Sequence, residues 1–188
     1  TDERYDGIRG IMKKSTILLF GDPVLREEAR PVVAFNKKLG MLIDGMRLTL
    51  AMRLDGAALA APQIGVSKRI TVIDYLGEYL ELVNPEIVET SGEQIDYEGC
   101  LSLPGFSGRV KRAETVRVRF QDRAGKERTI ERSGKMARCI QHEIDHLNGV
   151  LFIDRTGDEF LVNSFDGRRL AVRDMINTAP PRGKPVDV

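Results

Sequence analysis

The chain has two histidines, and they lie four residues apart in the segment QHEIDHLNG at residues 141–149. Positions i and i+4 of an α-helix share one face, so His142 and His146 can direct their ring nitrogens at one point. Glu143 directly follows the first histidine. The order HExxH is typical of a metal site in which the glutamate acts as a general base. Solvation of a surface helix is the alternative, but both histidines of the chain fall in this one pattern.

A third protein ligand is needed, because catalytic zinc-type sites commonly have three ligands and one open position. The chain offers two cysteines, Cys100 and Cys139. Cys139 precedes His146 by seven residues, which is about 10 Å along a helix axis, so we expect it to be a core thiol. Cys100 lies in a loop that can fold onto the helix, and a thiolate suits two imidazoles. The residues alone leave this ligand unassigned.

Three helices are predicted from apolar periodicity and capping residues. The helix of the two histidines begins near Lys135 and ends at Gly149. Asn36 caps an earlier helix that runs to about residue 53. A third amphipathic helix is predicted at residues 159–176, although Gly167 weakens it.

Strands are predicted at residues 69–74, 79–84, 115–120 and 127–131, and Pro85 is expected to close the second of them. Arg117 and Arg119 alternate with apolar residues and should form a solvated face. Strands and helices in this order predict an α+β fold, with antiparallel or mixed β-sheets packed around a central HExxH metal-binding helix.

Composition sets limits on the kind of protein. A chain of 188 residues is long enough for one domain with its own core. The net charge of +1 indicates neither nucleic-acid nor membrane-surface binding, and no apolar run is long enough for a membrane span. Two cysteines do not make a disulfide framework, so we expect a reducing, cytoplasmic location.

Domain boundaries are predicted near both ends. Residues 1–12 are expected to be an N-terminal extension or a cloning remnant, because Met12 is a plausible native start. Residues 13–176 are expected to form a single catalytic domain. Residues 177–188 contain three prolines and few apolar residues, which predicts a disordered tail.

Three segments follow one another in a fixed order: GAALAAPQ at 56–63, EGCLS at 98–102 and QHEIDH at 141–146. Together they resemble the peptide deformylases, bacterial and organellar enzymes that remove formyl groups from new protein N-termini. The resemblance extends from about residue 17 to residue 155 and includes GDPVLR and HLNGVLFID. It implies N-formylmethionyl nascent peptides as substrates, with transient ribosome contact and a monomer as the simplest expectations.

The resemblance implies a metal held by Cys100, His142 and His146. We expect Fe²⁺ in the cell, and Zn²⁺, Ni²⁺ or Co²⁺ in a purified sample. Glu143 would take a proton from a metal-activated water, which attacks the formyl carbon, and pass it to the departing amine. The resulting oxyanion would be stabilised by two further donors, Gln63 and the backbone N–H of Leu101.

The resemblance also implies that the peptide lies as an added strand beside the first segment. The residues expected to contact it are Gly56, Ala57, Ala58, Leu59, Gly99 and Arg138. Ala58 replaces the second glycine of the family pattern G-x-G-x-A-A-x-Q, and its methyl group should either narrow the cleft or force a slightly different pose of the peptide. Lys135 and Arg138 are expected to line the methionine pocket with their stems while their charges reach water.

Glu98 and Arg112 have two interpretations. They could form a pair that orients the Cys100 loop, as similar residues do in the family, or they could be unrelated exposed charges. The residues do not decide between them.

Two other functions are compatible with part of the pattern. A zinc peptidase would use the same HExxH chemistry with a third ligand from Asp154, Asp158 or Glu159, since no later histidine exists. A metal-stabilised binding protein without catalysis is the second alternative, supported by Ala58 and the basic residues near the pocket.

Overall fold

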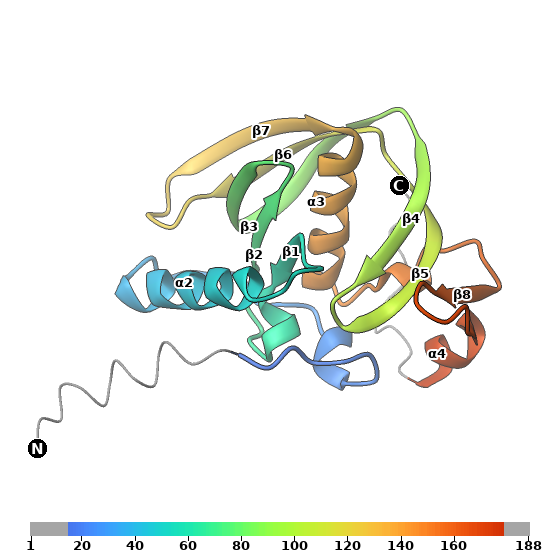
Figure 1. The fold of residues 1–188 in the computed structure, drawn as a ribbon. Coiled ribbons are helices and arrows are strands. Elements are labelled where there is room, and N and C mark those ends of the chain that lie inside the picture. Colours follow the sequence, from blue (N-terminus) through green and yellow to red (C-terminus); the bar gives the residue numbers. More distant parts are fainter. Residues whose placement is uncertain (1–14, 179–188) are drawn as a thin grey trace, which may run out of the picture.

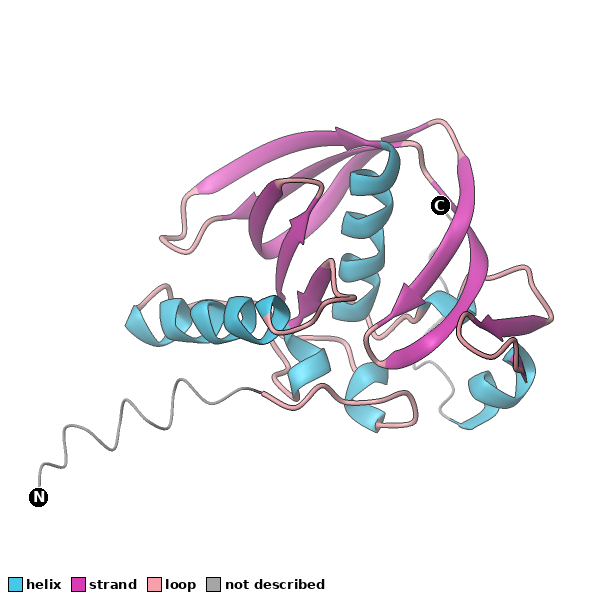
Figure 2. Cartoon of the chain, in the orientation of Figure 1, coloured by secondary structure: helices cyan, strands magenta, loops and turns pink. Residues whose placement is uncertain are grey.

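The computed structural model describes residues 15–178. Two antiparallel sheets lie on either side of one long helix, α3 (Gly134–Leu147), as Figure 1 shows. Helices form a minor part of this region (Figure 2). The predicted α+β class with antiparallel sheets is therefore confirmed. The predicted extension at residues 1–12 and residues 179–188 of the predicted tail lie outside the described residues.

The five-stranded sheet has the strand order β1-β2-β3-β6-β7. Its strands are β1 (Ala58–Ala60), β2 (Ile70–Tyr75), β3 (Glu78–Ser91), β6 (Thr115–Gln121) and β7 (Glu127–Ser133). In β6 the buried residues Val116 and Val118 alternate with exposed Arg117 and Arg119, as predicted. The buried side chains of this face pack against the apolar residues of α3, which fixes the helix on the sheet.

Helix α2 (Lys37–Ala51) covers the first strands of the same sheet. The side chain of Asn36 accepts hydrogen bonds from the N–H groups of Lys38 and Leu39 at 3.0 and 3.2 Å, so the predicted cap is confirmed. Buried α2 residues such as Ile43 and Met46 form one cluster with residues of β1 and β2. This packing holds β1 in place beside α3.

The four-stranded sheet has the order β4-β5-β8-β9. Its strands are β4 (Gln94–Cys100), β5 (Leu103–Arg112), β8 (Phe160–Asn163) and β9 (Arg169–Ala171). The predicted helix at residues 159–176 is wrong, because two strands and the short α4 (Val172–Thr178) occupy this region. Gly167 has a φ of +70°, which turns the chain back after β8. Helix α4 also includes residues 177 and 178, so the predicted tail begins two residues early.

Short 3₁₀ segments join these parts: η1 (Pro23–Arg26), η2 (Ala61–Ile64) and η3 (Phe152–Asp154). The prediction that Pro85 ends a strand is wrong, since β3 continues to Ser91. The pairing of β3 with β6 shifts register between Val83 and Glu86, where a residue without an N–H can be accommodated. Among residues 15–178, none of the helices is long and apolar enough to span a bilayer.

Candidate metal centre

Helix α3 places both histidines deep inside the protein. Its apolar residues, including Ile140 and Ile144, pack against the five-stranded sheet. His142 is 9 % exposed and His146 is 1 % exposed. The last residue of the helix is Leu147. Gly149, two residues later, has a φ of +70° and is the predicted left-handed residue after the end of the helix.

Cys100 reaches the two histidines from the other sheet. It is the last residue of β4, at a register shift between Gly99 and Cys100. Its Sγ lies 3.3 Å from Nε2 of His146. One potential ligand atom from each of Cys100, His142 and His146 lies within 4.8 Å of the others. Within residues 15–178, these three residues form the group of His, Cys, Asp and Glu side chains that could hold a metal ion.

The donor set fits a transition metal, since one thiolate and two imidazoles are suitable ligands. Nδ1 of His142 is bonded to Glu98, so its Nε2 is left for the cluster. His146 is buried, and its Nδ1 has no hydrogen-bond partner among residues 15–178. Cys139 lies outside the group, as expected, but it is partly buried and lines the cavity beside α3 as well as packing on the core cluster, and burial raises the pKa of its thiol well above the ordinary value.

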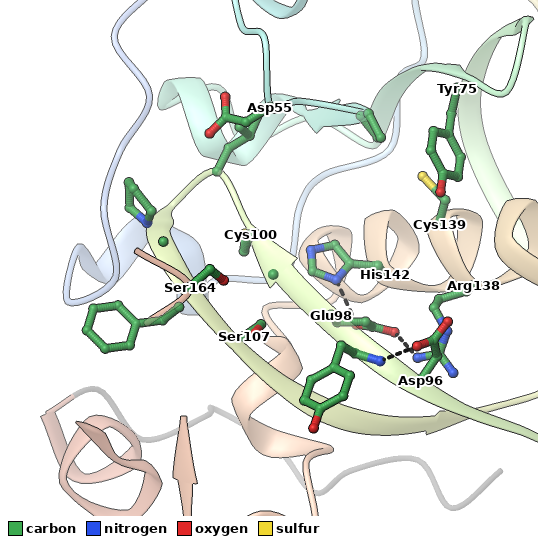
Figure 3. A pocket seen from close by; sticks show the side chains of 18 of the residues that line it. Asp55, Tyr75, Asp96, Glu98, Cys100, Ser107, Arg138, Cys139, His142 and Ser164 are labelled. Atoms are coloured by element: carbon green, nitrogen blue, oxygen red, sulfur yellow. Dashed lines mark hydrogen bonds and ion pairs between the residues drawn. The ribbon is translucent and has the colours of Figure 1, made fainter. Parts of the chain in front are cut away.

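Glu98 links the histidine to two arginines. Its carboxylate accepts hydrogen bonds from Arg112 Nε and Nη2 at 2.8 and 2.9 Å and from Arg138 Nη1 at 2.8 Å, and lies 2.9 Å from His142 Nδ1. Figure 3 shows Glu98 between His142 and Arg138. Burial alone raises the pKa of Glu98, but its bonds with Arg112 and His142 outweigh burial and hold the pKa well below the ordinary value. The pair of Glu98 and Arg112 is thus present and buried.

A second carboxylate extends this network behind α3. Asp145, one residue before His146, accepts hydrogen bonds from Arg112 Nη1 and from Arg155 Nε, both at 2.5 Å. Arg112 is 5 % exposed, so both of its acidic partners compensate a buried charge.

Glu143, which follows His142 directly in the chain, is buried. It is 4 % exposed, and Thr71 Oγ1 donates to its Oε2 at 3.4 Å. Burial raises the pKa of Glu143 to about 7. The carboxylate borders the same cavity as Cys100 and His142, so it can reach a molecule bound there.

Gln63 is held in one orientation next to Cys100. Its Oε1 accepts from the N–H of Ala60 at 2.9 Å, while its Nε2 donates to Ser102 Oγ at 3.2 Å and to Cys100 Sγ at 3.5 Å. The donor end of the amide therefore faces the ligand group. Leu101 follows Cys100 directly, and its side chain packs into the cluster of α2 and the first strands.

A cavity of about 570 Å³ opens over these residues. Of the six expected substrate contacts, Ala57, Ala58, Gly99 and Arg138 line it. Gly56 and Leu59 do not border the cavity, and Leu59 is fully buried against the α2 cluster.

Arg138 requires a correction. Lys135 is exposed, as expected, but the charge of Arg138 does not reach water. Arg138 is 6 % exposed and donates to Glu98 and also, from Nε, to Gln94 Oε1 at 3.2 Å. The two acceptors, half-buried Gln94 and buried Glu98, lie on β4, far from Arg138 in sequence, so the local pattern gave no sign of them.

Sequence reasoning also missed part of the cavity wall. Tyr97, Ser164 and Phe165 line the cavity, and the last two follow β8 in the region predicted to be helical. The side chains of Ser164 and Cys100 are labelled in Figure 3. Strong turn residues in the segment NSFDG at 163–167 were the available signal.

Comparisons with known proteins agree with this geometry. The model of the polypeptide deformylase family matches residues 14–159. The chain belongs to the peptide deformylase family. A peptide deformylase of Heliobacterium modesticaldum is 54 % identical over 143 residues, covering 76 % of this chain and 94 % of that protein.

Solved deformylase structures have the same fold. The crystal structure of the Thermotoga maritima enzyme matches with a TM-score of 0.75 and 41 % identity, covering 78 % of this chain and 99 % of that chain. The Acinetobacter baumannii enzyme, solved with Met-Ala-Ser bound, matches with a TM-score of 0.72 and 35 % identity, covering 77 % of this chain and 99 % of that chain. Peptide deformylases are metal-dependent hydrolases that remove the formyl group from N-formylmethionyl peptides, and this is the activity of the present chain.

Proposed function

We propose that Cys100, His142 and His146 hold the metal of this deformylase and that Glu143 transfers the protons of the reaction. The single observation that supports this most is the convergence of the three ligand atoms within 4.8 Å, next to the buried carboxylate of Glu143 and at the floor of a cavity. A divalent metal held there supplies a Lewis acid that polarises the formyl oxygen and lowers the pKa of water. We expect Fe²⁺ in the cell, with Zn²⁺, Ni²⁺ or Co²⁺ able to replace it.

Glu143 is proposed as the general base and acid, because it borders the same cavity as Cys100 and His142. It takes a proton from the attacking water and returns it to the amine nitrogen as the carbon–nitrogen bond breaks. The products are formate and a free N-terminal amine. Thr71 Oγ1 lies 3.4 Å from Oε2 of Glu143 and 3.1 Å from the carbonyl oxygen of Leu59, so its one hydroxyl proton is shared between these two acceptors.

Gln63 and Leu101 are proposed as oxyanion donors. Ala60 fixes the oxygen end of the Gln63 amide, so Nε2 points toward Cys100. The N–H of Leu101 follows the cysteine in the chain and completes the pair. Donors fixed before the substrate arrives stabilise developing negative charge without reorganisation.

The peptide is proposed to enter along β1, with Ala57, Ala58 and Gly99 at the cavity wall. The Met-Ala-Ser bound to the Acinetobacter enzyme is the peptide that deformylation of formyl-Met-Ala-Ser would release. We assign residues 13–176 to one catalytic domain in a translation enzyme of the cytoplasm. Transient ribosome contact and a monomeric state stay predictions.

Formate release tests these roles. The full chain is loaded anaerobically with Fe²⁺ and given formyl-Met-Ala-Ser, beside Glu143→Gln and Glu143→Ala variants whose metal content is measured. We expect both variants to keep one metal per chain and to lose at least about 100-fold in kcat. A metal-loaded wild type without formate release would favour the binding-protein alternative, and cleavage of internal peptide bonds would favour the peptidase.

The peptidase alternative has weaker support from the contacts of its candidate ligands. Asp154 forms an ion pair with Arg26, and Asp158 forms one with Arg109. Both carboxylates lie outside the group of Cys100 and the two histidines.

A further inference from the structure

Exposed aromatic side chains are concentrated at the substrate cavity. Among residues 15–178, two aromatic residues are in the exposed class, Tyr97 at 62 % and Phe165 at 89 %. Both line the cavity that contains Cys100 and Glu143. Exposed large apolar side chains gathered at a cavity indicate a binding surface, because aromatic rings supply large contact areas.

Phe165 lies beyond the segment that the family model matches. The family match ends at residue 159, and β8 begins at Phe160. The turn between β8 and β9 carries Ser164 and Phe165 to the cavity. This turn therefore adds a wall to a site whose other parts lie within the matched segment.

The turn is fixed in position before any ligand binds. Asn163 is 6 % exposed, and its Oδ1 accepts from the N–H groups of Phe165 at 2.9 Å and Asp166 at 3.3 Å. The N–H of Ser164 donates to the carbonyl of Gly105 at 2.9 Å. The bonds to Asn163 shape the turn, and the bond from Ser164 attaches it to β5, the strand that follows the Cys100 loop.

The ring of Phe165 lies close to the backbone of that strand. A Cβ atom placed on Gly105 would be 3.2 Å from Cδ2 and 3.3 Å from Cε2 of Phe165. Gly105 has no such atom, so the ring packs along the cavity edge and leaves most of its surface open. The backbone that carries the ring is already hydrogen-bonded, so a ligand that covers the ring has only the side-chain rotamer left to order.

The position of the Phe165 ring determines which residues of the peptide it can contact. The ligand group and Glu143 are buried, whereas Phe165 is exposed at the rim. With the formyl group at Glu143, an extended peptide advances about 3.3 Å per residue toward the outside. The residues that follow formylmethionine are therefore those that reach the rim.

Resting on the proposed function, we propose that Phe165 is a specificity-determining residue for the second and third residues of the peptide. It packs against apolar or aromatic side chains at these positions. The chain should thus deformylate nascent peptides with such residues after formylmethionine more efficiently than peptides with small or acidic ones.

The test compares formyl-Met-Ala with formyl-Met-Leu-Phe and formyl-Met-Ala-Phe, using metal-loaded full chain and a Phe165→Ala variant. We expect KM for the two peptides with Phe to rise about 10-fold in the variant, as for loss of an aromatic contact. Its kcat and its KM for formyl-Met-Ala should stay within about twofold. Phe165→Tyr should restore the preference, and Val33→Ala, which removes a side chain that is 85 % exposed and does not line the cavity, should have no effect.

Binding of the product Met-Leu-Phe, measured by calorimetry, separates this proposal from the proposed function. About 10-fold weaker binding to Phe165→Ala supports the role of the ring, whether or not formate is released. Equal binding and equal KM values in wild type and variant would overturn the role of Phe165. The same rise in KM for formyl-Met-Ala as for the longer peptides would also overturn it. Absence of formate release in wild type would count against the proposed function alone.

Discussion

Arg138 Nη1 donates to Glu98 Oε1 at 2.8 Å from within the wall of the substrate cavity. The same carboxylate holds His142 through its second oxygen. The cavity wall and the proposed metal ligand His142 therefore share one acidic group. A substitution of either arginine that bonds to Glu98 should change how firmly Glu98 orients the His142 ring.

Glu98→Gln should lower both stability and metal affinity. The substitution leaves the buried charges of Arg112 and Arg138 with less compensation, which costs about 3 to 5 kcal/mol of unfolding free energy. It also weakens the hydrogen bond that orients His142. Removing a group that hydrogen-bonds to a metal ligand typically lowers metal affinity by about 10- to 100-fold, and we expect a loss in this range. Urea unfolding and chelator competition measure the two effects.

A control for this variant is Glu86→Gln. Glu86 pairs with Arg119 at 2.6 Å, but both side chains are at least half exposed. Its loss should cost less than about 1 kcal/mol and leave the metal affinity unchanged. Equal effects of the two substitutions would contradict the role given to burial.

Arg138→Met should have a smaller effect than Glu98→Gln, because Glu98 keeps its two bonds from Arg112. We expect a loss of about 1 to 3 kcal/mol in unfolding free energy. Lys135→Met changes an exposed residue of the same cavity and should shift stability by less than about 0.5 kcal/mol. Thermal unfolding of both variants distinguishes a buried hydrogen-bonding residue from a general effect of removing positive charge.

The two cysteines should differ in metal binding. Both are partly buried, but Cys100 belongs to the ligand group and Cys139 does not. Cys100→Ala should weaken metal binding by more than about 100-fold, beyond the effect of losing an outer hydrogen bond to a ligand. Cys139→Ala should still bind one metal per chain. Elemental analysis after dialysis gives the stoichiometry, and metal retention by Cys100→Ala would refute the assignment.

Gly149→Ala should destabilise the fold strongly. The residue has a φ of +70°, and an added Cβ would lie 2.6 Å from the carbonyl oxygen of Arg26. Left-handed strain and the clash with backbone together should cost about 2 to 4 kcal/mol. Gly157→Ala is the matched control, since nothing lies within 4 Å of its added Cβ. The free energy of unfolding of both variants is measured with a denaturant. Equal losses in Gly149→Ala and Gly157→Ala would contradict the close packing of Gly149 on η1.

Elements whose start, end or pattern is set by a few neighbouring residues were predicted correctly from the sequence. Asn36 marked the start of α2, and Gly149 marked the end of α3. The strands β6 and β7 were also predicted from their residue pattern, and they pair with each other. The ligand histidines could be placed from their spacing because a helix alone brings them together.

The errors arose where distant contacts decide the structure. The backbone of residues 163–167 is held by Asn163 and by pairing of β8 with β5, so a helical apolar pattern did not become a helix. Arg138 was expected to be solvated because its acceptors on β4 are not neighbours in sequence. Placement of Cys100 depended on resemblance to a family, since no local signal brings a loop cysteine to a helix.

The proposed metal ligands come from two layers of the fold, Cys100 from the four-stranded sheet and the histidines from the helix packed on the five-stranded sheet. A bound metal is consequently a cross-link between residues that are distant in sequence, and its binding energy adds to folding. Oxidation of the Cys100 thiolate would remove this cross-link as well as a ligand. Oxidative inactivation of the enzyme should thus be accompanied by faster amide hydrogen exchange in the hairpin of β4 and β5, where the cross-link attaches.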